Sequence, residues 1–135
     1  MEKFVTLPGI ILVSGPKKSG KTHFIIYLLY SLAKTRKVNY IKVICPTAYS
    51  NTYDFLEPNQ VTEEYNEVEI YELIDTQVAL RKENKIRNAV LVLDDCIGTA
   101  NFRSHIWEKL PTTCRHYNLT IIIVTQHIFC LPPTL

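Results

Sequence analysis

The chain has 135 residues, enough for one domain with a buried core. Its composition, 47% hydrophobic and 21% charged, is ordinary for a globular protein, and the net charge of +2 is too small to indicate nucleic-acid binding by itself. The cysteines Cys45, Cys96, Cys114 and Cys130 include no CxxC pair, which argues against a zinc ribbon or a thioredoxin-type site and favours reduced, buried thiols.

The first predicted elements are a strand and a helix. Residues 9–14, GIILVS, form a continuous apolar run that is typical of a strand buried on both faces. A helix is predicted from Lys21 to about Thr35. Its apolar run at 24–33 is too short to cross a membrane, which needs about 20 apolar residues, and the N-terminus lacks a signal-peptide pattern. We therefore expect a soluble protein of the cytoplasm, or of a virion or nucleus reached from it, without a membrane partner.

Further strands and helices alternate along the rest of the chain. Strands are predicted at 39–46, 89–95 and 119–126, an amphipathic helix at 67–85, a short helix at 100–110, and a loop with one helical turn at 47–60. This alternation predicts a single α/β domain over residues 1–135, a three-layer αβα sandwich around a mainly parallel sheet. Four strands are few for such a fold, so a further strand is expected after residue 135, and the sequence is then a truncated core.

The spacing GxxxxGK[ST] at residues 15–22 is that of a phosphate-binding loop, and it stands between a predicted strand and a predicted helix. The glycines let successive backbone N–H groups face a phosphate, and the helix adds its positive N-terminal end. Lys21 would reach the β- and γ-phosphates of ATP, and Thr22 would offer its hydroxyl to Mg²⁺. The predicted nucleotide-binding residues are Gly15, Pro16, Lys17, Lys18, Ser19, Gly20, Lys21, Thr22 and His23. A solvated lysine pair accounts for Lys17 and Lys18 about as well as a phosphate contact does. A surface or packing position accounts for His23 better than nucleotide binding does.

The run VLVLDD at 90–95 matches the acidic strand of nucleoside-triphosphate hydrolases. Asp94, at the strand end, would hold Mg²⁺, and Asp95 would polarise the attacking water. The alternative is an acidic pair that caps the next turn. Glutamate is commoner than aspartate at the second position, so the shorter side chain makes the role of Asp95 the less secure of the two.

A third motif, IIIVTQ at 121–126, ends the last strand. Gln126 would hold the lytic water or sense the γ-phosphate, while Thr125 points to the other face by strand alternation. A polar strand end facing solvent is the alternative. If this strand lies between the loop strand and the acidic strand, the protein is an additional-strand ATPase and not a small GTPase or nucleotide kinase. A guanine-reading NKxD element is also lacking, because no aspartate follows Asn84 and Lys85 at that spacing.

Arg115 lies just before the last predicted strand, in TTCRHYNLT. On the exposed side of a subunit, it would point at the γ-phosphate of an adjacent subunit, as an arginine finger in trans. A surface arginine or a helix cap is the alternative.

Together, GPKKSGKT, LVLDD and CRHYNLTIIIVTQHIFCLPPTL resemble the genome packaging ATPases of large DNA viruses, the poxvirus-type members of the FtsK/HerA superfamily. The resemblance covers residues 8–135. It implies an ATP-driven motor that moves double-stranded DNA into a preformed capsid. It also implies a homo-oligomeric ring with nucleotide sites between subunits, and a capsid or portal protein as a further partner.

By the same resemblance, Lys21 and Thr22 bind phosphate and Mg²⁺, Asp94 and Asp95 form the acidic pair, Gln126 is the sensor and Arg115 is the trans-acting arginine. For a DNA contact, the basic run 81–87 is a candidate, with a solvated helix end as the better explanation.

Two other functions remain open at this point. One is a phage-assembly or protein-secretion ATPase with the same core, and the other is an ATP-binding interaction domain with little turnover. The intact Asp94–Asp95 pair speaks against the second.

Overall fold

The computed structural model describes residues 9–15, 20–35, 37–46, 53–94, 96 and 105–125, with the side chain of Thr22 left out. The elements in this part of the chain are β1 (Ile10–Ser14), α1 (Lys21–Lys34), β2 (Tyr40–Ile44), η3 (Pro58–Gln60), β3 (Val61–Thr62), α2 (Glu67–Lys82), β4 (Ala89–Asp94), α3 (His105–Thr113), η4 (Cys114–Tyr117) and β5 (Leu119–Thr125). Strand and helix alternate as the sequence predicts.

The strands form one parallel sheet in the order β1-β5-β4-β2-β3. The last strand in sequence, β5, is therefore central in space, and its residues are buried throughout. Its register places Thr125 beside Ser14 of β1 and Val124 beside Asp94 of β4. The carboxyl ends of β1, β5 and β4 thus meet at one edge of the sheet, where parallel α/β folds bind their ligands.

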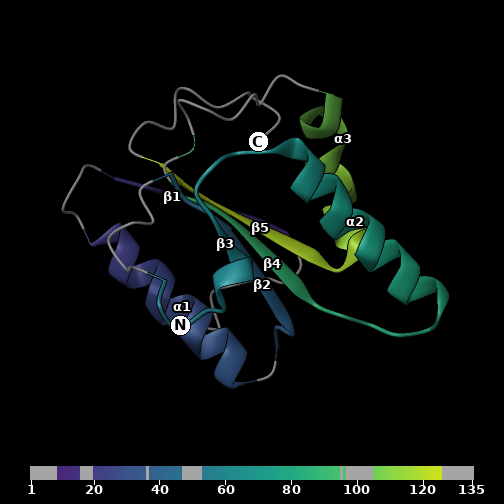
Figure 1. Cartoon of the computed structure of the whole chain (residues 1–135), viewed down its shortest axis with the longest axis horizontal. Helices are drawn as coiled ribbons and strands as arrows, with labels where there is room; N and C mark the ends of the chain where they lie inside the picture. The colour runs from purple at the N-terminus through teal and green to yellow at the C-terminus, as the bar shows by residue number, and fades with distance from the viewer. Residues whose placement is uncertain are drawn as a thin grey trace.

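Helices cover both faces of the sheet: α1 lies on one side, and α2 and α3 lie on the other (Figure 1). Alternate residues of each strand supply the two cores, because successive side chains of a strand point to opposite faces. In β4, Leu91 and Leu93 pack with α2 and α3, while Val90 and Val92 pack with α1. This arrangement is the predicted three-layer αβα sandwich.

The prediction of four strands was wrong, because the described part of the sheet has a fifth, β3, which lies within the chain. It pairs with β2 through Val43–Val61 and Ile44–Thr62. A strand of two residues, directly after the 3-10 turn η3, is too short to show any hydrophobic period. The helix predicted at 100–110 ends later than expected, since α3 runs to Thr113 through Pro111, and residues 100–104 lie outside the described residues. The strand expected after residue 135 stays a prediction.

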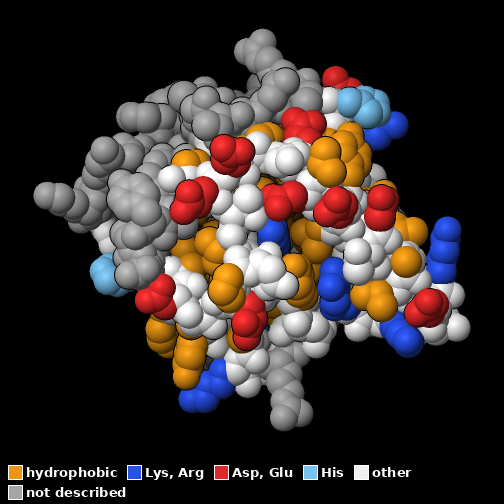
Figure 2. All heavy atoms as spheres, viewed as in Figure 1, with side chains coloured by type: hydrophobic (Ala, Val, Ile, Leu, Met, Phe, Trp, Pro, Cys, Tyr) orange, Lys and Arg blue, Asp and Glu red, His pale blue; other side chains and the backbone are white. Residues whose placement is uncertain are grey.

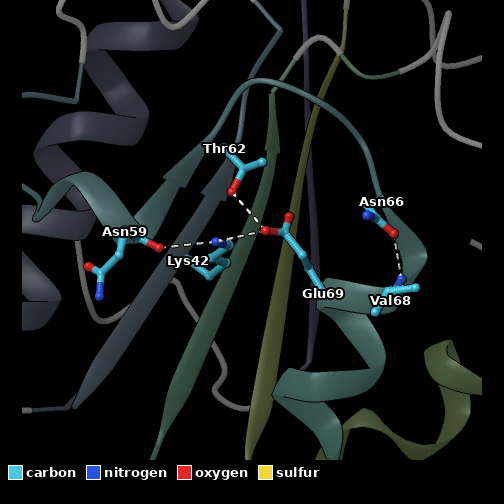
Figure 3. Close-up of polar contacts among 6 residues, drawn as sticks. All are labelled: Lys42, Asn59, Thr62, Asn66, Val68 and Glu69. Carbon is cyan, nitrogen blue, oxygen red and sulfur yellow. Dashed lines mark hydrogen bonds and ion pairs between the residues drawn. The ribbon is translucent and has the colours of Figure 1, made fainter.

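Polar contacts join β2, η3, β3 and α2 into one unit (Figure 3). Lys42 Nζ of β2 donates to the Asn59 carbonyl at 3.1 Å and lies 3.5 Å from Glu69 Oε1 of α2. Thr62 Oγ1 of β3 donates to the same carboxylate oxygen at 3.3 Å. The pairing of Lys42 and Glu69 is partly shielded from solvent, so it fixes the start of α2 over the edge of the sheet.

No helix in the described ranges combines the length and apolar character needed to cross a membrane. On the face shown in Figure 2, acidic side chains lie across the middle of the molecule, and basic ones lie mainly toward its lower and right-hand borders.

Candidate nucleotide-binding site

The phosphate-binding loop joins β1 to α1 at the carboxyl edge of the sheet. The Gly15 N–H donates to the Thr125 carbonyl at 3.2 Å, which extends the β1–β5 ladder one residue beyond the end of β1. Gly20 has a φ of 89°, a left-handed conformation that glycine adopts without strain. Its carbonyl accepts the first helical hydrogen bond of α1, from the Phe24 N–H at 3.0 Å. The second glycine of the motif is therefore needed where the loop turns into the helix.

The N-terminal ends of the two long helices, α1 and α2, differ in their caps and in the charge of their first turns. At the start of α2, the Asn66 side chain accepts from the Val68 N–H at 2.9 Å, and Glu67 and Glu69 lie in the first turn. The start of α1 has a glycine cap without a side-chain hydrogen bond, and its first turn is free of acidic residues. Unsatisfied N–H groups and the helix dipole favour an anion at such an end. Among the described helices, α1 thus has the terminus suited to phosphate.

The Lys21 side chain reaches back to Gly15. Its Nζ donates to the Gly15 carbonyl at 2.6 Å, so the ammonium group lies at the start of the loop although Lys21 belongs to the helix. This places a cation beside the N-terminal end of α1, as the motif predicts. Pro16, Lys17, Lys18 and Ser19 lie outside the described residues, as does the Thr22 side chain. His23 is exposed, which agrees with a surface position.

Asp94 ends β4 at the same edge of the sheet and is only 9% exposed. Strand alternation places it on the α1 face, because its neighbour Leu93 packs on the α2 and α3 face. A carboxylate at this point fits Mg²⁺, which is usually held by one or two carboxylates together with substrate phosphates. In the described ranges no group of three or more His, Cys, Asp and Glu side chains could hold a metal ion by itself.

Tyr53 is a further residue of this site that the sequence does not predict. Its hydroxyl donates to Asp94 Oδ2 at 2.7 Å. Burial is the main cause that raises the pKa of this phenol well above its usual range, and the Asp94 charge raises it further. The hydroxyl therefore keeps its proton at neutral pH and can donate it to the carboxylate. Tyr53 lies in a segment predicted to be a loop, and no sequence signal links it to a carboxylate 41 positions away.

Two predicted catalytic residues, Asp95 and Gln126, lie outside the described residues. Val124 packs in the core beneath α1, so Thr125, the residue before Gln126, lies on the opposite face of the sheet.

Arg115 is not brought together with the other predicted site residues. It is exposed in η4, at the amino end of β5, whereas Lys21 and Asp94 lie at the carboxyl edge of the sheet. A strand the length of β5 spans about 20 Å at 3.3 Å per residue. Arg115 is thus at the opposite end of the sheet from Lys21 and Asp94, which excludes a contact with a nucleotide bound by its own subunit and is compatible with a surface arginine or with a role in trans.

The basic run 81–87 is largely engaged in contacts within the protein. Arg81 Nη1 donates to the His116 carbonyl, and Lys85 lies 3.5 Å from Glu83. The Arg87 guanidinium stacks over the Tyr40 ring at 4.4 Å and donates to Gln77 Oε1 at 2.6 Å. These contacts favour a structural helix end over a DNA-binding patch.

Three features define an additional-strand phosphate-loop NTPase: the motif lysine bonded to Gly15 after β1, the acidic end of β4, and β5 between these two strands. The family "Poxvirus A32 protein" matches residues 3–134, and the chain belongs to this family. A comparison with individual curated proteins gives no significant match.

Several solved structures share the fold. The genome packaging NTPase B204 from Sulfolobus turreted icosahedral virus 2, in complex with AMPPCP, is 21% identical with a TM-score of 0.66, over 96% of this chain and 70% of that one. Its AMP complex is 19% identical with a TM-score of 0.68, over 96% and 71%. The N-terminal domain of zonular occludens toxin from Neisseria meningitidis is 16% identical with a TM-score of 0.51, over 96% and 72%.

Proposed function

We propose that this protein is an ATPase that drives the packaging of viral double-stranded DNA into a capsid. The observation that carries the proposal is that the Lys21 ammonium, bonded to Gly15 just after β1, and Asp94, at the end of β4, lie at one edge of the sheet on either side of β5. Membership of the poxvirus A32 family supports the viral setting. The similar protein from Sulfolobus turreted icosahedral virus 2 is a genome packaging NTPase that was solved with AMPPCP and ATP-γS, which supports ATP as the nucleotide.

In this proposal the residues of the loop bind the phosphates of ATP. The Lys21 ammonium exchanges the Gly15 carbonyl for phosphate oxygens, and the N–H groups at the start of α1 donate to the same phosphates. Thr22 and Asp94 hold Mg²⁺, which neutralises charge on the phosphates when it is bound. Asp95 polarises the attacking water and Gln126 holds it in place. Such positioned groups accelerate hydrolysis mainly by orientation and charge stabilisation.

We further infer that the active form is a homo-oligomeric ring, with a capsid or portal protein as its partner. The exposed Arg115, remote from its own nucleotide site, supports this inference, because an arginine at the opposite end of the sheet can reach only a neighbouring subunit's site. Double-stranded DNA would pass through the ring, and locally basic surfaces of the protein would bind its phosphates.

The test is ATP hydrolysis by the purified protein with and without double-stranded DNA, with the mass of the assembly measured in the same buffer. We expect Mg²⁺-dependent hydrolysis that DNA stimulates, and a mass of several subunits. Hydrolysis that is indifferent to DNA would contradict the packaging function and favour a secretion or phage-assembly ATPase. Tight ATP binding with negligible turnover, even in the oligomer, would favour an interaction domain instead.

A further inference from the structure

Tyr53 contacts both the core and the site. The side chain is 4% exposed and packs in the hydrophobic cluster between α1 and the sheet, with Ile25, Val43 and Val92 among its members. Its ring lies 6.4 Å from that of Phe55, and its carbonyl accepts from the Leu56 N–H at 3.1 Å. The ring is therefore fixed by packing, and the local turn fixes its backbone.

This packing couples Tyr53 to the phosphate-binding loop. Ile25 and Leu28, members of the same cluster, belong to α1, the helix that begins at Lys21. The hydroxyl at the tip of the ring meets Asp94 Oδ2 on β4. One side chain thus touches the core beneath the loop helix and the carboxylate of the acidic strand.

The carboxylate of an aspartate at the end of a strand does not have a fixed orientation by itself, because rotation about its Cβ–Cγ bond is soft. A hydrogen bond from a rigid donor removes that freedom. Outer partners of this kind hold metal-binding side chains in the orientation that the metal requires, and their loss usually costs 10- to 100-fold in metal affinity or activity.

We propose that Tyr53 is a positioning residue that orients the Asp94 carboxylate for the Mg²⁺ of bound nucleotide. The role rests on the proposed ATPase function, and it acts entirely through Asp94. It predicts that removing the hydroxyl weakens the response to Mg²⁺ while leaving the grip of the loop on the phosphates intact.

The experiment measures binding of a fluorescent ATP analogue to wild-type protein and to Tyr53→Phe, first in EDTA and then during a Mg²⁺ titration. In EDTA we expect equal affinities within about twofold, because Lys21 and the loop are unchanged. The Mg²⁺ concentration at half effect should rise about tenfold in Tyr53→Phe. The Mg²⁺ dependence of ATP hydrolysis should shift by the same factor.

The matched control is Tyr65→Phe, which removes a part-buried phenol oxygen at a different place in the fold. That oxygen accepts from Trp107 Nε1 at 2.6 Å. It should leave the Mg²⁺ half-point unchanged. Para-aminophenylalanine at position 53 keeps a donor on the same ring and should restore the wild-type value, and this variant also serves if Tyr53→Phe proves unstable. In an Asp94→Asn background, Tyr53→Phe should add less than a twofold shift.

Three results would overturn the role of Tyr53: an unchanged Mg²⁺ half-point in Tyr53→Phe, an equal shift in Tyr65→Phe, or an equal loss of affinity in EDTA. Wild-type protein that binds nucleotide without any response to Mg²⁺ would contradict the proposed function itself. The two failures are therefore distinguishable in the same titration.

Discussion

Gly20 and Lys21 are adjacent residues with different tasks at the nucleotide site. Gly20 supplies a backbone conformation with a φ of 89°, and Lys21 supplies a charge that reaches back to Gly15. The first task depends on the absence of a side chain, and the second depends on a long one. Their substitutions should therefore fail in different ways, one through backbone strain and one through lost phosphate contacts.

Lys21→Ala should abolish ATP binding without affecting the fold, since the lysine amine lies beside the Gly15 carbonyl and not in the hydrophobic core. We expect a loss of affinity of at least 100-fold, consistent with the removal of a charge-assisted hydrogen bond and a favourable ion pair. Fluorescent nucleotide binding measures the effect, and Lys34→Ala, at the last turn of the same helix, is the control. Normal hydrolysis by Lys21→Ala would exclude the phosphate-loop assignment.

Gly20→Ala should cost about 1–2 kcal/mol of unfolding free energy, because a left-handed conformation strains an L-residue with a Cβ. The strain arises from the backbone conformation, since among the described residues, apart from Gly20, its chain neighbours and the backbone of its own helix, no atom lies within 4 Å of the position that a Cβ would take. Gly20→Asn should lose less, since asparagine tolerates this region better. Denaturant unfolding followed by fluorescence of Trp107, the single tryptophan, measures both, and equal losses in the two variants would contradict backbone strain as the cause.

At the scale of elements, Gln77 joins α2 to the loops that lead into β4 and β5. The side chain is 3% exposed, and its Nε2 donates to the carbonyls of Arg87, which precedes β4, and Tyr117, which precedes β5. Arg87 Nε donates in return to Gln77 Oε1. A buried amide on a helix thus satisfies backbone groups of two separate loops, and it holds the amino edge of the sheet while the carboxyl edge is left for the nucleotide.

Gln77→Leu should destabilise the protein by about 1–3 kcal/mol, because it leaves buried carbonyls and the Arg87 N–H without their partner at similar side-chain volume. The free energy of unfolding in urea, followed by Trp107 fluorescence, is the measurement. Thr76→Ala, the neighbouring exposed position on α2, should change it by no more than about 0.5 kcal/mol. A Gln77→Leu protein as stable as wild type would show that water replaces the lost contacts.

For the whole molecule, the two ends of the sheet carry different parts of the proposed machine. Lys21, Asp94 and Tyr53 occupy the carboxyl edge, and Arg115 occupies the amino end of β5. If Arg115 acts in trans, a complete active site needs two subunits, each contributing one end of its sheet. The position of Arg115 at the end of the sheet opposite Lys21 and Asp94 is compatible with this arrangement.

Arg115→Ala should keep ATP binding but lose at least about 10³-fold in turnover if the arginine acts as a finger in trans. Because Arg115 is exposed, stability should change by no more than about 0.5 kcal/mol. Mixing Arg115→Ala with Asp95→Asn should restore part of the activity, since some interfaces then combine an intact arginine with an intact acidic pair. Mixed rings without any recovery would contradict the trans role.

Most of the fold could be predicted from the sequence, and the reasons are physical. Strands β4 and β5 are buried on both faces, so their apolar runs are continuous and easily recognised. The phosphate-binding loop has a fixed spacing, because few backbones can surround a phosphate. A position of β5 between β1 and β4 was expected only if the protein was an additional-strand NTPase, and the observed sheet order has β5 in that position.

The parts that could not be predicted depend on contacts between distant positions. Strand β3 exists only because β2 offers an edge for two residues. The Tyr53–Asp94 hydrogen bond joins residues 41 positions apart, and the Gln77–Tyr117 bond joins residues 40 apart. A tyrosine in a polar loop and a glutamine in a helix look ordinary in the sequence, and only the packed fold gives them partners.

The order of the strands has a consequence for the newly made chain. Strand β1 is the first to leave the ribosome, yet its ladder partner in the described sheet, β5, is the last of the described strands to be synthesised. Until residues 119–125 emerge, β1 has an unpaired, apolar edge, and the loop behind it cannot gain its anchor between Gly15 and Thr125. ATP can therefore stabilise the chain only after residues 119–125 have been made, and earlier intermediates expose the edge of β1 to aggregation.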